Sequence, residues 1–154
     1  MTDETANGPA DPDGPPEGVA LENHDEALWR IVIAQWQDES GPGYKAFMPT
    51  KKDKKRLSTS RSSMVTAKEA YQNYVEDGGK AASTTWAVTV GQAVDLTVPP
   101  YADGEVYGWR ACHASLYFGR KSNGEMKKVS KILAAMASNR GCQFDVTDEG
   151  EDEP

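Results

Sequence analysis

The chain lacks any apolar run near the roughly 20 residues that a membrane-spanning helix needs, and its N-terminus lacks a signal-peptide pattern. It holds only two cysteines and two histidines in 154 residues, with no CxxC spacing and no cluster of metal-ligand residues. We therefore expect a cytoplasmic protein without a metal, a cofactor or a membrane partner. Cys112 and Cys142 lie in apolar segments and are expected to be buried, reduced thiols.

Positive charge is missing from both ends of the chain. Residues 1–26 contain eight Asp or Glu and residues 145–154 contain six, with no Lys or Arg in either segment. The rest of the chain contains ten acidic and seventeen basic residues, so a protein of net charge −7 has a body of charge +7. Such a body attracts anions, and tethered acidic tails compete for the same surface.

Aromatic residues are also absent from both ends, which are rich in acidic residues, Gly and Pro. Such segments bury too little apolar surface to offset the entropy lost on ordering. We therefore predict disordered acidic tails at 1–26 and 147–154. Between them, residues 27–146 form a single domain of a usual size for one hydrophobic core.

The apolar pattern of this body alternates between strand and helix periods. Strands are predicted at 28–36, 44–48, 56–60, 86–90, 111–118 and 142–146. Capping boxes at Thr66/Glu69 and Ser122/Glu125 begin two helices, whereas residues 92–98 fit either a strand or a helix. The order of elements predicts an α+β domain, with a mixed or antiparallel sheet of about five to six strands and two helices packed on one face.

Basic residues gather after residue 44 and on the exposed side of the second helix. Lysines suit phosphate contacts because each is a flexible point charge that needs no fixed geometry. The predicted anion-binding residues are Lys45, Lys51, Lys52, Lys54, Lys55, Arg56, Arg61, Lys127, Lys128 and Lys131. The alternative is a solvated charged surface that only keeps the domain soluble.

Aromatic residues lie beside these cations and in a later loop. Tyr44 and Phe47 suit stacking on bases. Tyr101, Tyr107, Trp109 and Arg110 form the combination of aromatic residues and arginine that is usual at protein interfaces. The alternative for the loop residues is that they cover an edge of the core.

A smaller signal indicates an enzyme. Arg30 on the first strand and Ser58, Thr59 and Ser60 on a later one resemble the arginine and Ser-Thr-Ser pattern of one class of ADP-ribosyltransferases. The resemblance implies that Arg30 holds a phosphate of the dinucleotide and that the serine motif braces the site. Strands 86–90 and 111–118 contain no carboxylate to act as the catalytic glutamate of that class, so no catalytic residue is assigned. His113 has no identifiable acidic neighbour and is interpreted as a structural histidine.

Together these patterns favour a non-enzymatic binding module whose basic body engages a polyanion, either nucleic acid or an acidic protein surface. One alternative is an ADP-ribosyltransferase-like or other nucleotide-using enzyme. Another is an antitoxin- or immunity-like partner of a second protein. Salt-sensitive polyanion binding, turnover of NAD and co-purification of a protein would distinguish the three.

Overall fold

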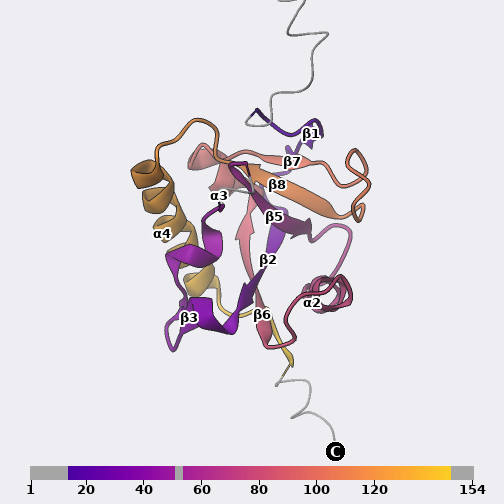
Figure 1. The fold of residues 1–154 in the computed structure, drawn as a ribbon, viewed down its shortest axis with the longest axis vertical. Coiled ribbons are helices and arrows are strands. Elements are labelled where there is room, and N and C mark those ends of the chain that lie inside the picture. The colour runs from indigo at the N-terminus through magenta and orange to yellow at the C-terminus, as the bar shows by residue number, and fades with distance from the viewer. Residues whose placement is uncertain (1–13, 51–53, 147–154) are drawn as a thin grey trace, which may run out of the picture.

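The computed structural model describes residues 14–50 and 54–146, and it confirms an α+β domain (Figure 1). Within these residues, seven strands form one antiparallel sheet in the order β1-β7-β8-β5-β2-β6-β9. Its strands are β1 (Val19–Ala20), β2 (Ala27–Ile33), β5 (Arg56–Arg61), β6 (Ser83–Thr89), β7 (Pro100–Ala102), β8 (His113–Tyr117) and β9 (Phe144–Asp145). A hairpin of β3 (Gln37–Asp38) and β4 (Gly41–Pro42) forms a second, smaller sheet. The helices are α2 (Ala67–Glu76), α3 (Val90–Asp95) and α4 (Asn123–Arg140), with 3-10 turns η1 (Ala34–Trp36) and η2 (Tyr44–Phe47).

The two long helices lie on opposite faces of the sheet, not on one face as predicted (Figure 1). Side chains alternate along β6, so Thr85 and Trp86 point to opposite sides. Trp86 belongs to the core that includes Leu133 of α4, whereas Thr85 donates a hydrogen bond to the Ala67 carbonyl at the start of α2 (3.2 Å). The sheet is therefore a middle layer, with α4 on one face and α2 on the other.

Both predicted capping boxes are present, at Thr66/Glu69 and Ser122/Glu125. A third, at Thr89/Gln92, begins α3, so the ambiguous segment 92–98 begins in a helix and not in a strand. Residues 44–48 do not form the predicted strand. Tyr44–Phe47 fold as η2, a short 3-10 turn whose buried residues, Ala46 and Phe47, belong to the same core as α4.

The ordered domain begins earlier than residue 27. β1 pairs with β7 at Val19 and Ala102, and Glu26 is buried with 6 % of its surface exposed. Residues 14–26, predicted as part of a disordered tail, therefore belong to the fold, because backbone pairing and one buried carboxylate anchor a segment that has few apolar residues. The rest of the predicted tails, 1–13 and 147–154, lies outside the described residues.

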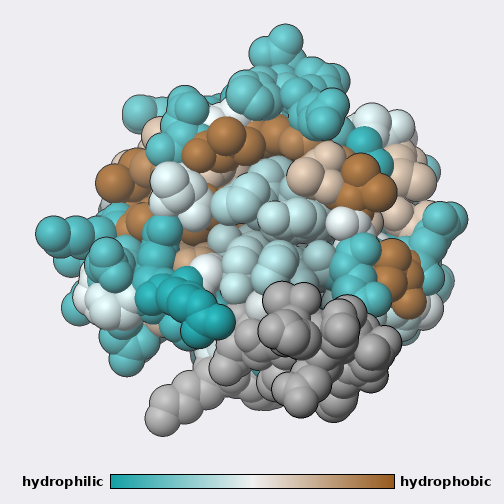
Figure 2. All heavy atoms as spheres, turned by 90° about the horizontal axis from the view of Figure 1, so that it is seen from above, coloured by the Kyte–Doolittle hydropathy of each residue, from teal (hydrophilic) through white to brown (hydrophobic). Residues whose placement is uncertain are grey.

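The surface of the domain carries both hydrophilic and hydrophobic side chains (Figure 2). Seen from above in Figure 2, strongly hydrophilic side chains lie mainly around the periphery, with hydrophobic patches between them. Cys112 is buried as predicted, but Cys142 is exposed because it follows the end of α4. Among the described helices, none is long and apolar enough to cross a membrane.

Candidate active site

A cleft of about 970 Å³ opens on the face of the sheet that carries α2. Strands β2 and β5 contribute its floor, α2 one wall, and residues 108–113 the other. Along the described strands, β2 pairs with β6 over its whole length but with β5 only at Leu28–Arg61 and Trp29–Ser60. The sheet is therefore open between β2 and β5 beyond Trp29, where the cleft lies.

A chain of three hydrogen-bonded side chains lies at this cleft. The Nε2 atom of His113 is 3.1 Å from Ser58 Oγ, and its Nδ1 atom is 2.7 Å from Asp103 Oδ1. Ser58 is exposed to the cleft, whereas Asp103 is completely buried. The other Asp103 oxygen accepts a hydrogen bond from the buried Ser115 hydroxyl (2.7 Å).

The pairing of three strands brings these residues together. In the register between β5 and β8, Ser60 is opposite His113 and Ser58 is opposite Ser115. His113 is therefore a diagonal neighbour of Ser58 on the same face, within reach of a long side chain. β7 pairs with the other edge of β8, with Ala102 opposite Ala114, so Asp103 follows the end of β7 beside His113.

The partners of His113 favour one tautomer of its neutral imidazole. A carboxylate only accepts hydrogen bonds, so His113 Nδ1 donates to Asp103. When the imidazole is neutral, the lone pair of Nε2 accepts from the Ser58 hydroxyl. An imidazole held in this tautomer can remove the serine proton as the oxygen attacks an electrophile. The arrangement is therefore chemically able to activate Ser58 as a nucleophile.

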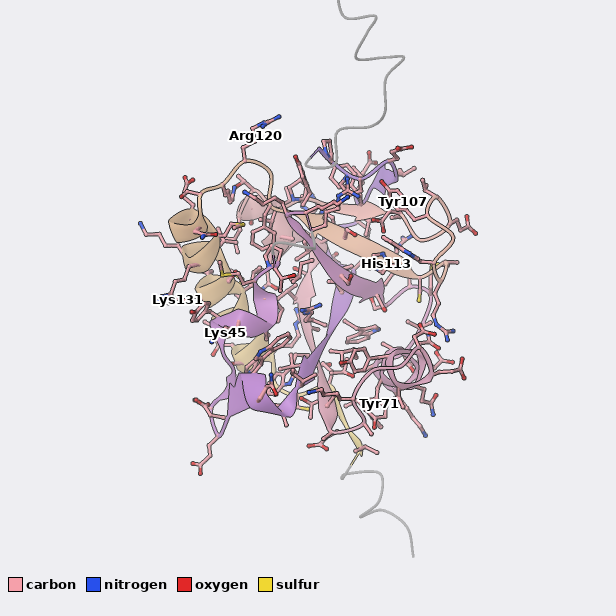
Figure 3. The ribbon with its side chains drawn as sticks, in the orientation of Figure 1. Lys45, Tyr71, Tyr107, His113, Arg120 and Lys131 are labelled. Carbon is pink, nitrogen blue, oxygen red and sulfur yellow. The ribbon has the colours of Figure 1, made fainter. Side chains whose placement is uncertain are left out.

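The loop between β7 and β8 packs its aromatic residues beside the three hydrogen-bonded side chains, Ser58, His113 and Asp103. The Trp109 ring lies 4.6 Å from the His113 ring, and the Tyr107 ring lies 5.0 Å from Trp109. The loop is closed by a hydrogen bond from the Trp109 N–H to the Gly104 carbonyl (2.7 Å). In Figure 3, Tyr107 and His113 lie on the same side of the molecule. Trp109 is half exposed, so its indole is available at the rim of the cleft.

Arg110 ties this loop to the end of α2. Its guanidinium donates to both oxygens of Asp77 (2.8 and 2.9 Å) and to Glu76 (2.7 Å). The hydrogen bonds that Arg110 donates lower the pKa of Asp77, and donating to Asp77 and Glu76 raises the pKa of Arg110. The loop and α2 are thus joined across one end of the cleft, although an exposed pair adds little stability.

The residues that resemble the ADP-ribosyltransferase pattern all line this cleft, but they have different contacts. Arg30 donates to the carbonyls of Ala46 (2.7 Å) and Ser58 (3.0 Å), so it connects η2 to the sheet. Thr59 is buried and donates to the Ala114 carbonyl (2.8 Å). Ser58 and Ser60 point to the cleft face, because they alternate with Thr59 along β5.

The predicted anion-binding residues do not form one surface. Arg61 pairs with the buried Glu26 (3.1 Å), Arg56 donates to the Gly14 carbonyl (2.9 Å), and Lys55 donates to the Lys121 carbonyl (2.8 Å). These three contacts join segments of the fold. Lys54, which is exposed, stands in the turn before β5, while Lys51 and Lys52 lie outside the described residues. Four exposed lysines, Lys45, Lys127, Lys128 and Lys131, lie on η2 and α4.

The predicted aromatic interface residues are also divided. Phe47 is completely buried and is a core residue, because η2 inserts it beneath α4. Tyr101 packs edge-on against Tyr117 (6.4 Å), whereas Tyr107 packs against Trp109. Tyr44 lies beside α4, where the ammonium groups of Lys127 and Lys131 are 5.0 and 5.9 Å from its ring centre.

Asp103 and Ser115 are the site residues that sequence reasoning missed. His113, interpreted from the sequence as a structural histidine, has Asp103 as its acidic neighbour. Alternation along a strand at 111–118 puts His113 and Ser115 on one face, but the sequence gives no sign that β7 delivers Asp103 to the same point.

No family model, curated protein or solved structure matches this chain. Within the described residues, no group of three His, Cys, Asp or Glu is arranged to hold a metal ion.

Proposed function

We propose that this protein is an esterase-like enzyme that uses Ser58 as its nucleophile. The observation that carries the proposal is the continuous hydrogen-bonded chain from Asp103 through His113 to a serine hydroxyl that faces a cleft. Nucleophile, base and orienting carboxylate are the three roles that acyl transfer to serine requires.

In the proposed reaction, Ser58 Oγ attacks the carbonyl carbon of an ester and forms a carbon–oxygen bond. The hydroxyl proton passes to His113 Nε2, which returns it to the leaving alkoxide as the ester bond breaks. Water then attacks the acyl-serine, giving its proton to His113, and the acid is released as Ser58 regains its hydrogen. Asp103 keeps the imidazole in its tautomer and stabilises the imidazolium that forms in each half of the cycle.

The walls of the cleft indicate the kind of substrate. Its aromatic lining comes from β2, η1, α2 and the β7–β8 loop, through Trp29, Trp36, Tyr74 and Trp109. Pockets lined by aromatic side chains with a few polar groups hold the apolar part of a ligand and orient it through those groups. An ester with an aromatic or branched apolar group fits this lining better than a highly charged one.

The proposal is tested by labelling the full-length protein with a fluorophosphonate, which reacts covalently with activated serines. We expect one adduct, assigned to Ser58 by peptide mass spectrometry. Ser58→Ala should abolish it, and His113→Gln should reduce its rate by about 100-fold or more because the general base is lost. Hydrolysis of a series of 4-nitrophenyl esters should show the same dependence on both residues.

Ser60→Ala is the matched control. Ser60 is on the same strand and lines the same cleft, but Ser58 is the serine hydrogen-bonded to His113. This variant should keep the rate of labelling. Absence of labelling in a wild-type protein of native circular dichroism would refute the proposal. So would labelling that is insensitive to His113→Gln in a variant whose melting temperature is preserved.

The nucleotide-using alternative stays a prediction, with a separate test. It requires Arg30 to bind a phosphate, whereas two of its donors already bind the carbonyls of Ala46 and Ser58. Release of nicotinamide from NAD that disappears in Arg30→Lys would favour this alternative over the esterase. An antitoxin- or immunity-like role likewise stays a prediction, and co-purification of a stoichiometric protein partner would support it.

A further inference from the structure

The surface formed by Tyr44, Lys45, Lys127, Lys128 and Lys131 is separate from the cleft. We call it the lysine surface. It lies on the face of the sheet covered by α4, and in Figure 3 Lys45 and Lys131 are on the opposite side of the molecule from His113. The packing of η2 against α4 brings Lys45 near α4, although the two lysine groups are far apart in the sequence.

Tyr44 holds two of these cations close together. The ammonium groups of Lys127 and Lys131 are 5.0 and 5.9 Å from the centre of its ring, so they are at most about 11 Å from each other. Attraction to the electron-rich face of the ring favours this placement of both side chains. Two like charges held near one ring repel each other, and an anion bound between them relieves that repulsion.

Two carboxylates near the lysine surface have hydrogen-bond partners of their own. The side chain of Glu125 caps the N-terminus of α4 by accepting from the Ser122 N–H (2.9 Å). Hydrogen bonds from Ser122, with the charges of Lys121 and Lys128, lower the pKa of Glu125. Asp38, on the hairpin beside α4, accepts from the hydroxyl and N–H of Ser40. Among the described residues, none of the four lysines forms an ion pair with a carboxylate.

We propose that the lysine surface binds the phosphate backbone of single-stranded nucleic acid. Lysines with an adjacent tyrosine are the combination found in grooves that follow a nucleic-acid strand without reading its sequence. A protein partner is less favoured, because lysine is depleted at protein interfaces and arginine is enriched. All the cations of this surface are lysines.

The test is fluorescence anisotropy of a labelled oligothymidylate of about 20 nucleotides, titrated with the full-length protein between about 50 and 200 mM salt. If Lys45, Lys127 and Lys131 each neutralise one phosphate, the logarithm of the association constant should fall with that of the salt concentration with a slope of about −2. The double variant Lys127→Gln/Lys131→Gln should reduce the slope to about −0.7. It should also lower the affinity at least tenfold at the lowest salt concentration.

Two matched variants separate this surface from general charge effects. Tyr44→Phe keeps the ring and should bind as the wild type does, whereas Tyr44→Leu should bind more weakly. Lys80→Gln removes one charge beside the cleft, on the other side of the sheet, and should change the affinity less than twofold. Equal weakening by Lys80→Gln, or no binding at the lowest salt concentration, would overturn the proposal.

A polyglutamate peptide is the competing ligand. If it bound as tightly as the oligonucleotide and lost affinity with the same lysine substitutions, the surface would be assigned to acidic proteins and the proposal would be wrong. The outcome is independent of the esterase proposal, because none of these variants changes Ser58, His113 or Asp103.

Discussion

Replacing Glu26 by glutamine tests the new N-terminal boundary of the domain. The Glu26 side chain is 3 % exposed and accepts hydrogen bonds from Arg61 Nε and Nη2 (3.1 Å each), the Ser63 N–H (3.2 Å) and the Ser63 hydroxyl (2.6 Å). A glutamine occupies the same volume, but its NH₂ group faces donors where the second carboxylate oxygen was. The substitution leaves the cation of Arg61 without its counter-ion.

The expected loss of stability follows from this environment. Removing one partner of a buried ion pair costs about 3–5 kcal/mol. Arg61 keeps 25 % of its side-chain surface in water, and the glutamine still accepts with one oxygen, so we expect about 2–3 kcal/mol. In a domain of this size that lowers the melting temperature by roughly 10 °C.

Urea unfolding of the wild type, Glu26→Gln and the control Glu22→Gln measures the effect. Glu22 is in the same segment but is exposed, so its variant should be within about 0.5 kcal/mol of the wild type. A Glu26→Gln protein as stable as the control at pH 7 would refute the argument, and residues 14–26 would then contribute little to the fold.

The pH dependence gives a second measurement on the same proteins. Burial alone would raise the pKa of Glu26, but hydrogen bonds from Arg61 and Ser63, with the charge of Arg61, lower it below the usual 4.5. A lowered pKa in the folded state stabilises the protein above the pKa of the unfolded state, and this stabilisation is lost as the pH falls through the folded-state value. The difference in the free energy of unfolding between the wild type and Glu26→Gln should therefore be constant near pH 7 and should shrink below about pH 4.5.

Two further predictions concern the ends and turns of the domain. Deleting residues 1–13 should leave the melting temperature unchanged, because every described contact is kept. It should also raise oligonucleotide affinity at low salt, because four acidic competitors are removed. Deleting residues 1–26 should lower the melting temperature by more than Glu26→Gln does. Gly41 has a φ of +123° and an added Cβ would meet Ser138 of α4, so Gly41→Ala should cost about 1–3 kcal/mol in urea unfolding. Gly43→Ala, at a φ of −85° and with ordinary contacts, should be neutral or slightly stabilising, and equal losses in the two variants would contradict the backbone argument.

Local signals in the sequence predicted local structure well. The capping boxes at Thr66/Glu69 and Ser122/Glu125 involve residues three positions apart, so their pattern alone identifies both helix starts. The side of the sheet to which each helix packs depends on connections that no local pattern reports. The prediction that both helices pack on one face is wrong for this reason. The prediction of a strand at 44–48 is wrong because Ala46 and Phe47 are buried in a 3-10 turn against α4.

The candidate site depends on register, which is a long-range property. The predicted strands 56–60 and 111–118 contain Ser58, Ser60, His113 and Ser115, and alternation along a strand puts His113 and Ser115 on one face. These residues come together only because β5 pairs with β8. Asp103 reaches them only because β7 pairs with the other edge of β8. Asp103 also stands in a Gly- and Asp-containing loop, where composition favours an exposed turn residue over a buried carboxylate.

The burial of Asp103 bears on why the chain has this residue at all. A completely buried carboxylate loses its hydration, and its partners are a histidine and the neutral hydroxyl of Ser115. Apolar residues of similar volume are often as stabilising as a buried ionic group, or more so. Stability alone therefore does not account for an aspartate here, whereas orienting His113 toward Ser58 does. Local sequence rules tend to fail at functional positions, and one of the places where they fail in this chain is the residue that completes the proposed active site.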